Sequence, residues 1–156
     1  METLDYVELK HFLSEHSEGL NSFELPEEQA QFTSLPNKFF EVTEGQNRIV
    51  ILSENEPVGF FLLHSTERIK EYSNNPNAIL LTSVNQAKQG KGYAKQAMLL
   101  LSDFVKSEFP NCDEIVLAVN HRNIPAKRLY SSVGFKDTGQ RKIGPIGEQF
   151  IMSLPL

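Results

Sequence analysis

The sequence of 156 residues is 40% hydrophobic and 22% charged, which is typical of a globular domain, and we expect residues 1–156 to form a single domain. Its net charge of −5 argues against general binding to nucleic acid or to anionic membranes, because both favour basic surfaces. The single cysteine, Cys112, excludes an intramolecular disulfide and a thiolate metal cage, and the segment after Met1 lacks the apolar core of a signal peptide, so we predict a cytoplasmic protein without a metal.

The N-terminal part of the chain is predicted to contain a short strand and several helical turns. Residues 6–9 can form the strand, and residues 12–25 are weakly helical. Pro26 and the acidic residues after it are typical of a helix start, because proline fits the first turn and acids favour the positive end of the helix dipole. Asn37 can cap a second short helix. We expect these two helices to form a lid.

The middle of the chain is predicted to form three strands and a long helix. Residues 48–52 and 58–64 are apolar runs separated by turn-forming residues, which indicates an antiparallel hairpin. A polar connection follows and leads to an apolar, β-prone run over residues 79–84. After Tyr93 the apolar residues recur at three- and four-residue spacing, which predicts a helix that Pro110 ends.

The remaining sequence predicts a strand, a helix and two closing strands. Residues 114–119 form an apolar run that is typical of a strand buried on both faces. Asn123 is placed to cap the next helix, and Gly134 is its expected stop. Residues 135–137 and 149–153 follow as two strands joined by a turn that contains glycine and proline. The predicted order of elements is therefore β, α, α, β, β, β, α, β, α, β, β.

A turn that contains Gly90 and Gly92 lies where the predicted strand gives way to the long helix. Its glycines permit positive φ and let a ligand approach the main chain. The first amides of a helix have no acceptor within the helix, and the helix dipole places partial positive charge at the same end. Three lysines add mobile positive charge nearby: Lys88, Lys91 and Lys95. We predict that this turn binds a phosphorylated ligand.

Two common phosphate-binding patterns do not fit this turn. A P-loop requires Lys and then Ser or Thr after the second glycine, whereas Tyr93 and Ala94 follow Gly92. A dinucleotide-binding fingerprint requires a small residue at the position of Lys95. The turn instead resembles the acetyl-CoA pyrophosphate loop of the GCN5-related N-acetyltransferase (GNAT) family, whose pattern Gln89, Gly92 and Ala94 match in register.

A second stretch resembles the same family at the end of its fifth strand and in its fourth helix. The matching residues are Asn123, Ala126, Leu129, Tyr130, Gly134 and Phe135. The predicted order of elements is also that of the family, and the resemblance covers the chain from Ile49 to the C-terminus. It implies an α/β (α+β) fold, in which a mixed, mostly antiparallel central sheet with flanking helices is split at the cofactor cleft.

The resemblance also implies acetyl-CoA as co-substrate and assigns residues to its contacts. In the family, strands four and five separate, and main-chain groups of strand four bind the pantetheine arm and the acetyl oxygen. Ser83 and Val84 occupy that position here. The expected cofactor-binding residues are Ser83, Val84, Gln89, Gly90, Lys91, Gly92, Tyr93, Ala94, Lys95, Asn123, Ala126 and Tyr130. Without the resemblance, Val84 is equally well a core residue and Asn123 a plain helix cap.

Tyr130 is the candidate general acid. A tyrosine with a reference pKa of about 10 stays protonated at neutral pH and can pass its proton to a departing thiolate. Periodicity alone favours a half-buried aromatic side chain that packs on the inner face of its helix. The match of Leu129 and Tyr130 to the family favours the catalytic interpretation.

The general base and the acceptor stay open at this point. A carboxylate, a histidine or a water chain must take up the proton of the amine, and the candidates are Glu24, Glu27, Glu28, His64 and His121. We predict direct transfer, in a ternary complex, to a primary amine of a polyamine-like molecule, an amino sugar or an amino acid. The enzyme would be a monomer or a homodimer. Alternatives are acetylation of a protein N-terminus or lysine, and a non-catalytic regulatory protein that binds acyl-CoA.

Overall fold

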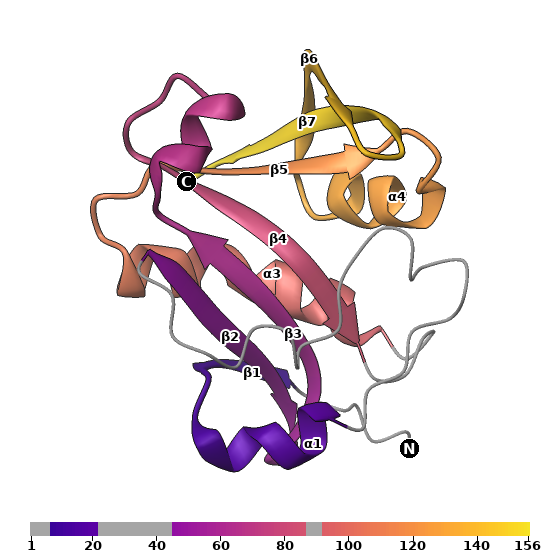
Figure 1. Cartoon of the computed structure of the whole chain (residues 1–156). Coiled ribbons are helices and arrows are strands. Elements are labelled where there is room, and N and C mark those ends of the chain that lie inside the picture. Colours follow the sequence, from indigo (N-terminus) through magenta and orange to yellow (C-terminus); the bar gives the residue numbers. More distant parts are fainter. Residues whose placement is uncertain (1–6, 22–44, 87–91) are drawn as a thin grey trace.

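The computed structural model describes residues 7–21, 45–86 and 92–156, and within these ranges seven strands form one sheet (Figure 1). The strand order is β1-β2-β3-β4-β5-β7-β6, and every neighbouring pair is antiparallel except β4 and β5. The strands are β1 (Val7–His11), β2 (Gln46–Ser53), β3 (Glu56–His64), β4 (Ala78–Gln86), β5 (Glu114–Asn120), β6 (Lys136–Gly144) and β7 (Gly147–Pro155). The prediction of a mixed, mostly antiparallel sheet is confirmed.

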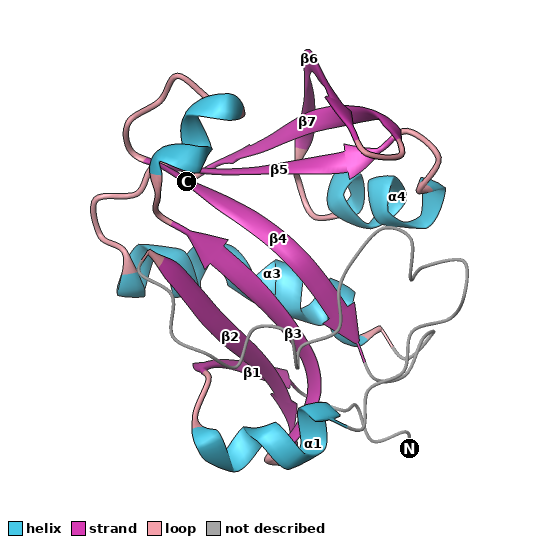
Figure 2. Cartoon of the chain, in the orientation of Figure 1, coloured by secondary structure: helices cyan, strands magenta, loops and turns pink. Residues whose placement is uncertain are grey.

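Helices flank the sheet, as the sequence predicts (Figure 2). They are the short 3-10 helices η1 (Ser14–His16) and η3 (Glu67–Glu71) and the α-helices α1 (Ser17–Asn21), α3 (Tyr93–Glu108) and α4 (Ile124–Ser132). The caps of the two long helices have the expected form, because Gly92 precedes α3 and the Asn123 side chain caps α4. The helices predicted after Pro26 and Asn37, and with them the lid, lie outside the described residues.

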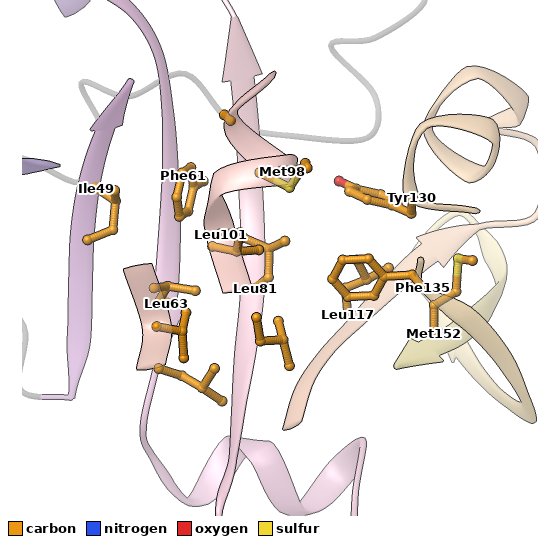
Figure 3. Packing of buried hydrophobic residues seen from close by; sticks show 14 of the residues in the cluster. Ile49, Phe61, Leu63, Leu81, Met98, Leu101, Leu117, Tyr130, Phe135 and Met152 are labelled. Atoms are coloured by element: carbon orange, nitrogen blue, oxygen red, sulfur yellow. The ribbon is translucent and has the colours of Figure 1, made fainter. Parts of the chain in front are cut away.

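One continuous core joins α3 and α4 to one face of the sheet (Figure 3). The inner side of α3 contributes Ala97, Met98, Leu101 and Val105, which follow the spacing of a helical stripe. Alternate strand residues meet them from the sheet: Ile49, Ile51, Phe61, Leu63, Ile79, Leu81, Ile115, Leu117, Val119 and Met152. Burial of each large side chain contributes roughly 1.5–3 kcal/mol, so this core fixes α3 across the middle of the sheet.

The opposite face of the sheet carries two smaller apolar clusters. Phe60 and Leu62 pack there with Leu20 of α1. Leu80 and Val116 pack there with Ile69 of η3. Strand residues on this face alternate with those of the main core, as the pleat of a β-strand requires.

β4 and β5 separate after a short contact, and this separation positions the site. They pair only through Ala78–Leu80 and Glu114–Val116. Beyond that point β4 stays paired with β3 and β5 stays paired with β7, so the two halves of the sheet diverge like the arms of a V (Figure 1). The split sheet implied by the family resemblance is therefore present.

A carboxylate network ties together the closed end of the V. Glu114, the first residue of β5, accepts hydrogen bonds from Ser153 Oγ on β7 (2.7 Å) and from Ser73 Oγ in the loop before β4 (3.0 Å). Asn75 from the same loop donates to Asp113 (2.7 Å). Hydrogen bonds to charged groups contribute about 1.5–3 kcal/mol each when they are shielded from solvent, so the two part-buried bonds to Glu114 reinforce the short β4–β5 contact.

Two elements differ from the sequence-based expectation. β6 is predicted over residues 135–137 but extends to Gly144, and its first six residues are all exposed, so no apolar alternation marks it. η3 lies in the connection that is predicted to be merely polar, where Thr66 Oγ1 caps it by accepting from Arg68 N–H (3.3 Å). Both elements gain their stability from partners that are distant in the sequence.

We expect Gly45→Ala to destabilise the fold by about 2–4 kcal/mol. Gly45 has a φ of +74°, and a Cβ added there would lie 2.5 Å from Thr66 Cγ2. Gly139 is the matched control, because it has a φ of +85° and an added Cβ would meet no described atom within 4 Å. Gly139→Ala should therefore cost only the backbone strain, about 1–2 kcal/mol. Urea denaturation measures both, and equal losses would contradict the steric argument.

Candidate active site

A β-bulge in β4 lies beside the opening between the arms. Thr82 pairs with Leu62 and Asn85 pairs with Phe60, so Ser83 and Val84 both lie opposite the single residue Phe61. From Leu81 onward no strand of the described chain pairs with the β5 side of β4. Bulges of this kind redirect main-chain groups and end strand pairing. The two residues expected to bind the pantetheine arm and the acetyl oxygen are thus found where β4 has left β5.

The N-terminus of α3 follows this strand in the chain. Gly92 is the N-cap, with a φ of +77°, and its carbonyl accepts the first helical hydrogen bond from Gln96 N–H (3.0 Å). The amides of the first turn, such as those of Tyr93 and Lys95, have no acceptor within the helix, and the 16-residue helix adds its dipole. A Cβ at Gly92 would meet no described atom within 4 Å, which leaves room for a ligand against the main chain.

The rest of the expected phosphate-binding turn is only partly placed. Tyr93 and Ala94 are buried and anchor the start of α3, while Lys95 is exposed. Gln89, Gly90 and Lys91 lie outside the described residues. The start of α3 is therefore the part of the predicted anion site that lies within the described residues.

The start of α4 supplies the next expected contacts. Asn123 is buried, and its Oδ1 accepts from Ala126 N–H at 3.4 Å, so its side chain is a helix N-cap, as predicted. Its own N–H donates to Asn120 O (2.9 Å) at the end of β5. Ala126 is half-buried on the first turn. These contacts fix the direction in which α4 leaves β5.

Tyr130 projects from α4 into the space between α4 and α3. Its side chain is only 8% exposed, its ring packs edge-on against Phe135 at 5.7 Å, and its hydroxyl points toward Met98 of α3 (Figure 3). Burial raises the pKa of Tyr130 above its ordinary value, so the hydroxyl stays protonated. No hydrogen-bond partner of this hydroxyl is found in the described part of the chain. A buried hydroxyl without a partner is costly and is suited to a ligand that supplies one.

The candidate bases fall in different places. Glu24, Glu27 and Glu28 lie outside the described residues. His121 is half-buried in the loop after β5, where its main-chain N–H donates to Glu148 O (2.9 Å) at the β6–β7 hairpin. His64 is buried at the end of β3, and its Nε2 lies 2.6 Å from Thr82 Oγ1 on β4. Of the two candidates in the described ranges, His64 is the one that contacts the strand that carries the bulge.

Sequence reasoning did not single out Thr82. Its partner His64 is 18 residues away, and the contact depends on the β3–β4 register. The signal that could have found it is the alternation of side chains along a strand. Thr82 is two residues after Leu80 and therefore lies on the same face, opposite the main core.

Other chemistries find little support in the described residues. The Cys112 thiol is half-buried and donates to Glu114 O (3.3 Å), and burial raises its pKa, which is typical of an unreactive thiol. No group of three His, Cys, Asp or Glu side chains there is placed to hold a metal ion. Among the described helices, none is both long enough and apolar enough to cross a membrane.

Sequence comparison relates the chain to acetyltransferases. The model of a family described as the acetyltransferase (GNAT) family matches residues 10–135. The chain is also 51% identical over 152 residues to the uncharacterized N-acetyltransferase YbbJ of Bacillus subtilis (strain 168). That match covers 94% of this chain and 95% of the relative.

Solved structures of acetyltransferases have the same fold. The aminoglycoside acetyltransferase AAC(6')-Ib in complex with paromomycin and acetyl-CoA has a TM-score of 0.74 and 16% identity, over 97% of this chain and 94% of that one. A spermidine N-acetyltransferase chimera of SpeG from Vibrio cholerae and hSSAT has a TM-score of 0.68 and 18% identity, over 96% and 95%. At these identities the likeness shows the fold alone.

Proposed function

Because the chain belongs to the acetyltransferase (GNAT) family and is an N-acetyltransferase, we propose that it transfers the acetyl group of acetyl-CoA directly to the primary amine of a small molecule. The transfer takes place in a ternary complex. The observation that carries this proposal is the divergence of β4 from β5 at a bulge that leads to the Gly92 end of α3. A cytoplasmic location and a monomeric or homodimeric state belong to the same proposal.

Two features of the chain fit the co-substrate. The open space at the Gly92 backbone, next to the first amides of α3, suits a pyrophosphate, and Lys95 adds a positive charge. The Tyr130 hydroxyl, which has no hydrogen-bond partner among the described residues, suits a sulfur atom that needs a proton. In this proposal the phosphate contacts are completed by Gln89, Gly90, Lys91 and Ala94. The part of acetyl-CoA between its pyrophosphate and its thioester is lined by Asn123 and Ala126.

The proposed mechanism uses the main chain for charge stabilisation and Tyr130 for proton transfer. Main-chain groups at Ser83 and Val84 orient the thioester and stabilise the charge that builds on its oxygen as the amine attacks. Tyr130 then donates its proton to the departing sulfur. Its raised pKa favours the protonated form at neutral pH, which a proton donor requires. The thioester supplies the acetyl group and the leaving thiol.

The proposed acceptor is a small amine. Its support is the similarity in fold to acetyltransferases whose names refer to aminoglycosides and to spermidine. A polyamine-like molecule, an amino sugar and an amino acid are the classes to test first.

An acceptor panel tests this proposal directly. Purified protein is incubated with acetyl-CoA and with spermidine, an aminoglycoside, amino acids or peptides, and release of the free thiol is followed. We expect thiol release well above the rate of hydrolysis with at least one small amine. Turnover with peptides only would identify a protein acetyltransferase. Binding of acetyl-CoA without turnover on any amine would identify a regulatory protein instead.

A further inference from the structure

His64 and Thr82 form a polar pair on the face of the sheet opposite α3. His64 Nε2 and Thr82 Oγ1 are 2.6 Å apart across β3 and β4. On β3, His64 shares its face with Phe60 and Leu62, and on β4, Thr82 shares its face with Leu80. All three of these apolar neighbours belong to clusters outside the main core. The two side chains therefore lie on the face of the sheet opposite α3 and α4.

Thr82 is the more exposed member of this pair. Thr82 is half-buried, whereas His64 is only 4% exposed. Thr82 is also the last residue in regular register before the bulge, and it lies past Leu80, where the β4–β5 contact ends. Thr82 therefore borders the opening between the arms, and the His64 imidazole lies behind its hydroxyl.

The electrostatic surroundings keep His64 neutral. Burial, and secondarily the charge of Arg68 on η3, lower the pKa of His64 to about 4. The facing positions on the neighbouring strands are uncharged, because Gln46 pairs with His64 from β2 and Leu80 pairs with it from β4. Arg48 on β2 is directed to the Phe12 ring, with its guanidinium 4.6 Å from the ring centroid. None of the carboxylates in the described ranges forms an ion pair with His64.

We propose that Thr82 and His64 form a proton relay that removes a proton from the acceptor nitrogen during acetyl transfer. This inference rests on the function proposed above and assigns the base that the sequence leaves open. In the tautomer with its proton on Nδ1, His64 accepts a hydrogen bond from the Thr82 hydroxyl through Nε2. Thr82 is then the group that touches the acceptor, and His64 acts through it.

The proton balance of the reaction accommodates this relay. As the neutral amine bonds to the thioester carbon, the carbonyl electron pair moves to oxygen and the nitrogen becomes positively charged. Thr82 takes one proton from that nitrogen while its own hydroxyl proton passes to His64 Nε2. The carbonyl then re-forms as the carbon–sulfur bond breaks, and the sulfur takes the proton of Tyr130. After the products leave, the proton returns from His64 through the Thr82 hydroxyl to solvent, and Tyr130 takes a proton from solvent. The products are the N-acetylated amine and free CoA.

The weak basicity of His64 suits this particular proton. A nitrogen bonded to the reacting carbon is a far stronger acid than a free ammonium group, whose pKa is about 10. A base of low pKa is unprotonated at neutral pH and readily gives the proton back, here through the Thr82 hydroxyl. It would be a poor base for an ammonium ion, so the acceptor must enter the site as the neutral amine.

The pH dependence of turnover tests the relay. We expect His64→Gln and Thr82→Val to lower kcat by on the order of 10²-fold at pH 7, with unchanged affinity for acetyl-CoA. The loss of kcat should become steadily smaller toward pH 9.5, because hydroxide and other bases in solution then accept the proton in place of the relay. Thr82→Ser keeps the hydroxyl and should keep most of the activity. The matched control is His11→Gln, which removes a histidine bound to Glu108 (2.6 Å) and should leave the pH profile unchanged.

Several outcomes would overturn the relay without touching the proposed function. One is a loss of kcat that is equal at every pH and is accompanied by a lower melting temperature, because this pattern indicates a structural role. Another is a changed pH profile in His121→Gln but not in His64→Gln. If His64→Gln does not fold, the comparison of Thr82→Val with Thr82→Ser decides the question, and equal activities refute the relay. A wild-type protein that turns over no amine refutes the proposed function itself.

Discussion

Gly92→Glu is expected to raise the Kd for acetyl-CoA by at least about 10²-fold. The substituted side chain would start in the open space beside the first turn of α3, where the pyrophosphate is proposed to lie. Its carboxylate would repel the phosphates, and juxtaposed like charges cost several kcal/mol of binding free energy. Isothermal titration calorimetry with acetyl-CoA measures the effect.

Two control variants separate charge from backbone strain. Gly92→Ala imposes the strain of a side chain at a φ of +77° without the charge, so it should weaken binding far less. Gly139→Glu adds the same charge at a φ of +85° on β6, away from α3, and should leave affinity unchanged. Unaltered acetyl-CoA binding by Gly92→Glu would show that the phosphates do not bind at the N-terminus of α3.

Tyr130→Phe is expected to lower kcat by on the order of 10²-fold with little change in the Kd for acetyl-CoA. Phenylalanine keeps the ring that packs on Phe135 and removes only the hydroxyl that points toward Met98 (Figure 3). Steady-state turnover and equilibrium binding distinguish the two effects. Tyr72→Phe is the control, because Tyr72 is also buried but packs in the cluster around Leu80 on the other face. Equal kcat for Tyr130→Phe and wild type would make Tyr130 a core residue only.

The titration of Tyr130 adds a signature at high pH. In the unfolded chain a tyrosine loses its proton near its reference pKa of about 10, whereas burial raises the pKa of the folded Tyr130 above that value. Above pH 10 the unfolded state therefore binds fewer protons than the folded state, and the free energy of unfolding falls as pH rises. Tyr130→Phe should lack this part of the loss, which urea denaturation at pH 9 and pH 11 measures.

The elements that the sequence predicts well are those with a strong local signal. α3 shows a helical apolar stripe that includes Ala97, Met98 and Leu101, and a proline follows its end. The β2–β3 turn has positive φ at Glu54 and Asn55, as a two-residue hairpin requires, and the flanking strands are apolar. Such features depend on neighbours in the chain, so the sequence alone reveals them.

The elements that it misses depend on distant partners. The strand character of Thr138 to Gly144 comes from pairing with β7, because its own side chains are mostly exposed. η3 is held through Ile69 against the sheet and through an ion pair of Glu71 with Lys142 (2.7 Å). The His64–Thr82 contact likewise requires the β3–β4 register. No local pattern in those segments carries this information.

The short contact between β4 and β5 has a mechanical consequence. Three residue pairs and the hydrogen bonds to Glu114 hold the arms together at the closed end, whereas the angle between the arms depends on the side chains that pack against both of them. Apolar side chains of α3, among them Leu101 and Met98, belong to the same packed cluster as Leu81 of one arm and Leu117 of the other. The volume of these α3 side chains therefore sets the distance between the two arms. A shorter side chain at Leu101 would let the arms move closer together.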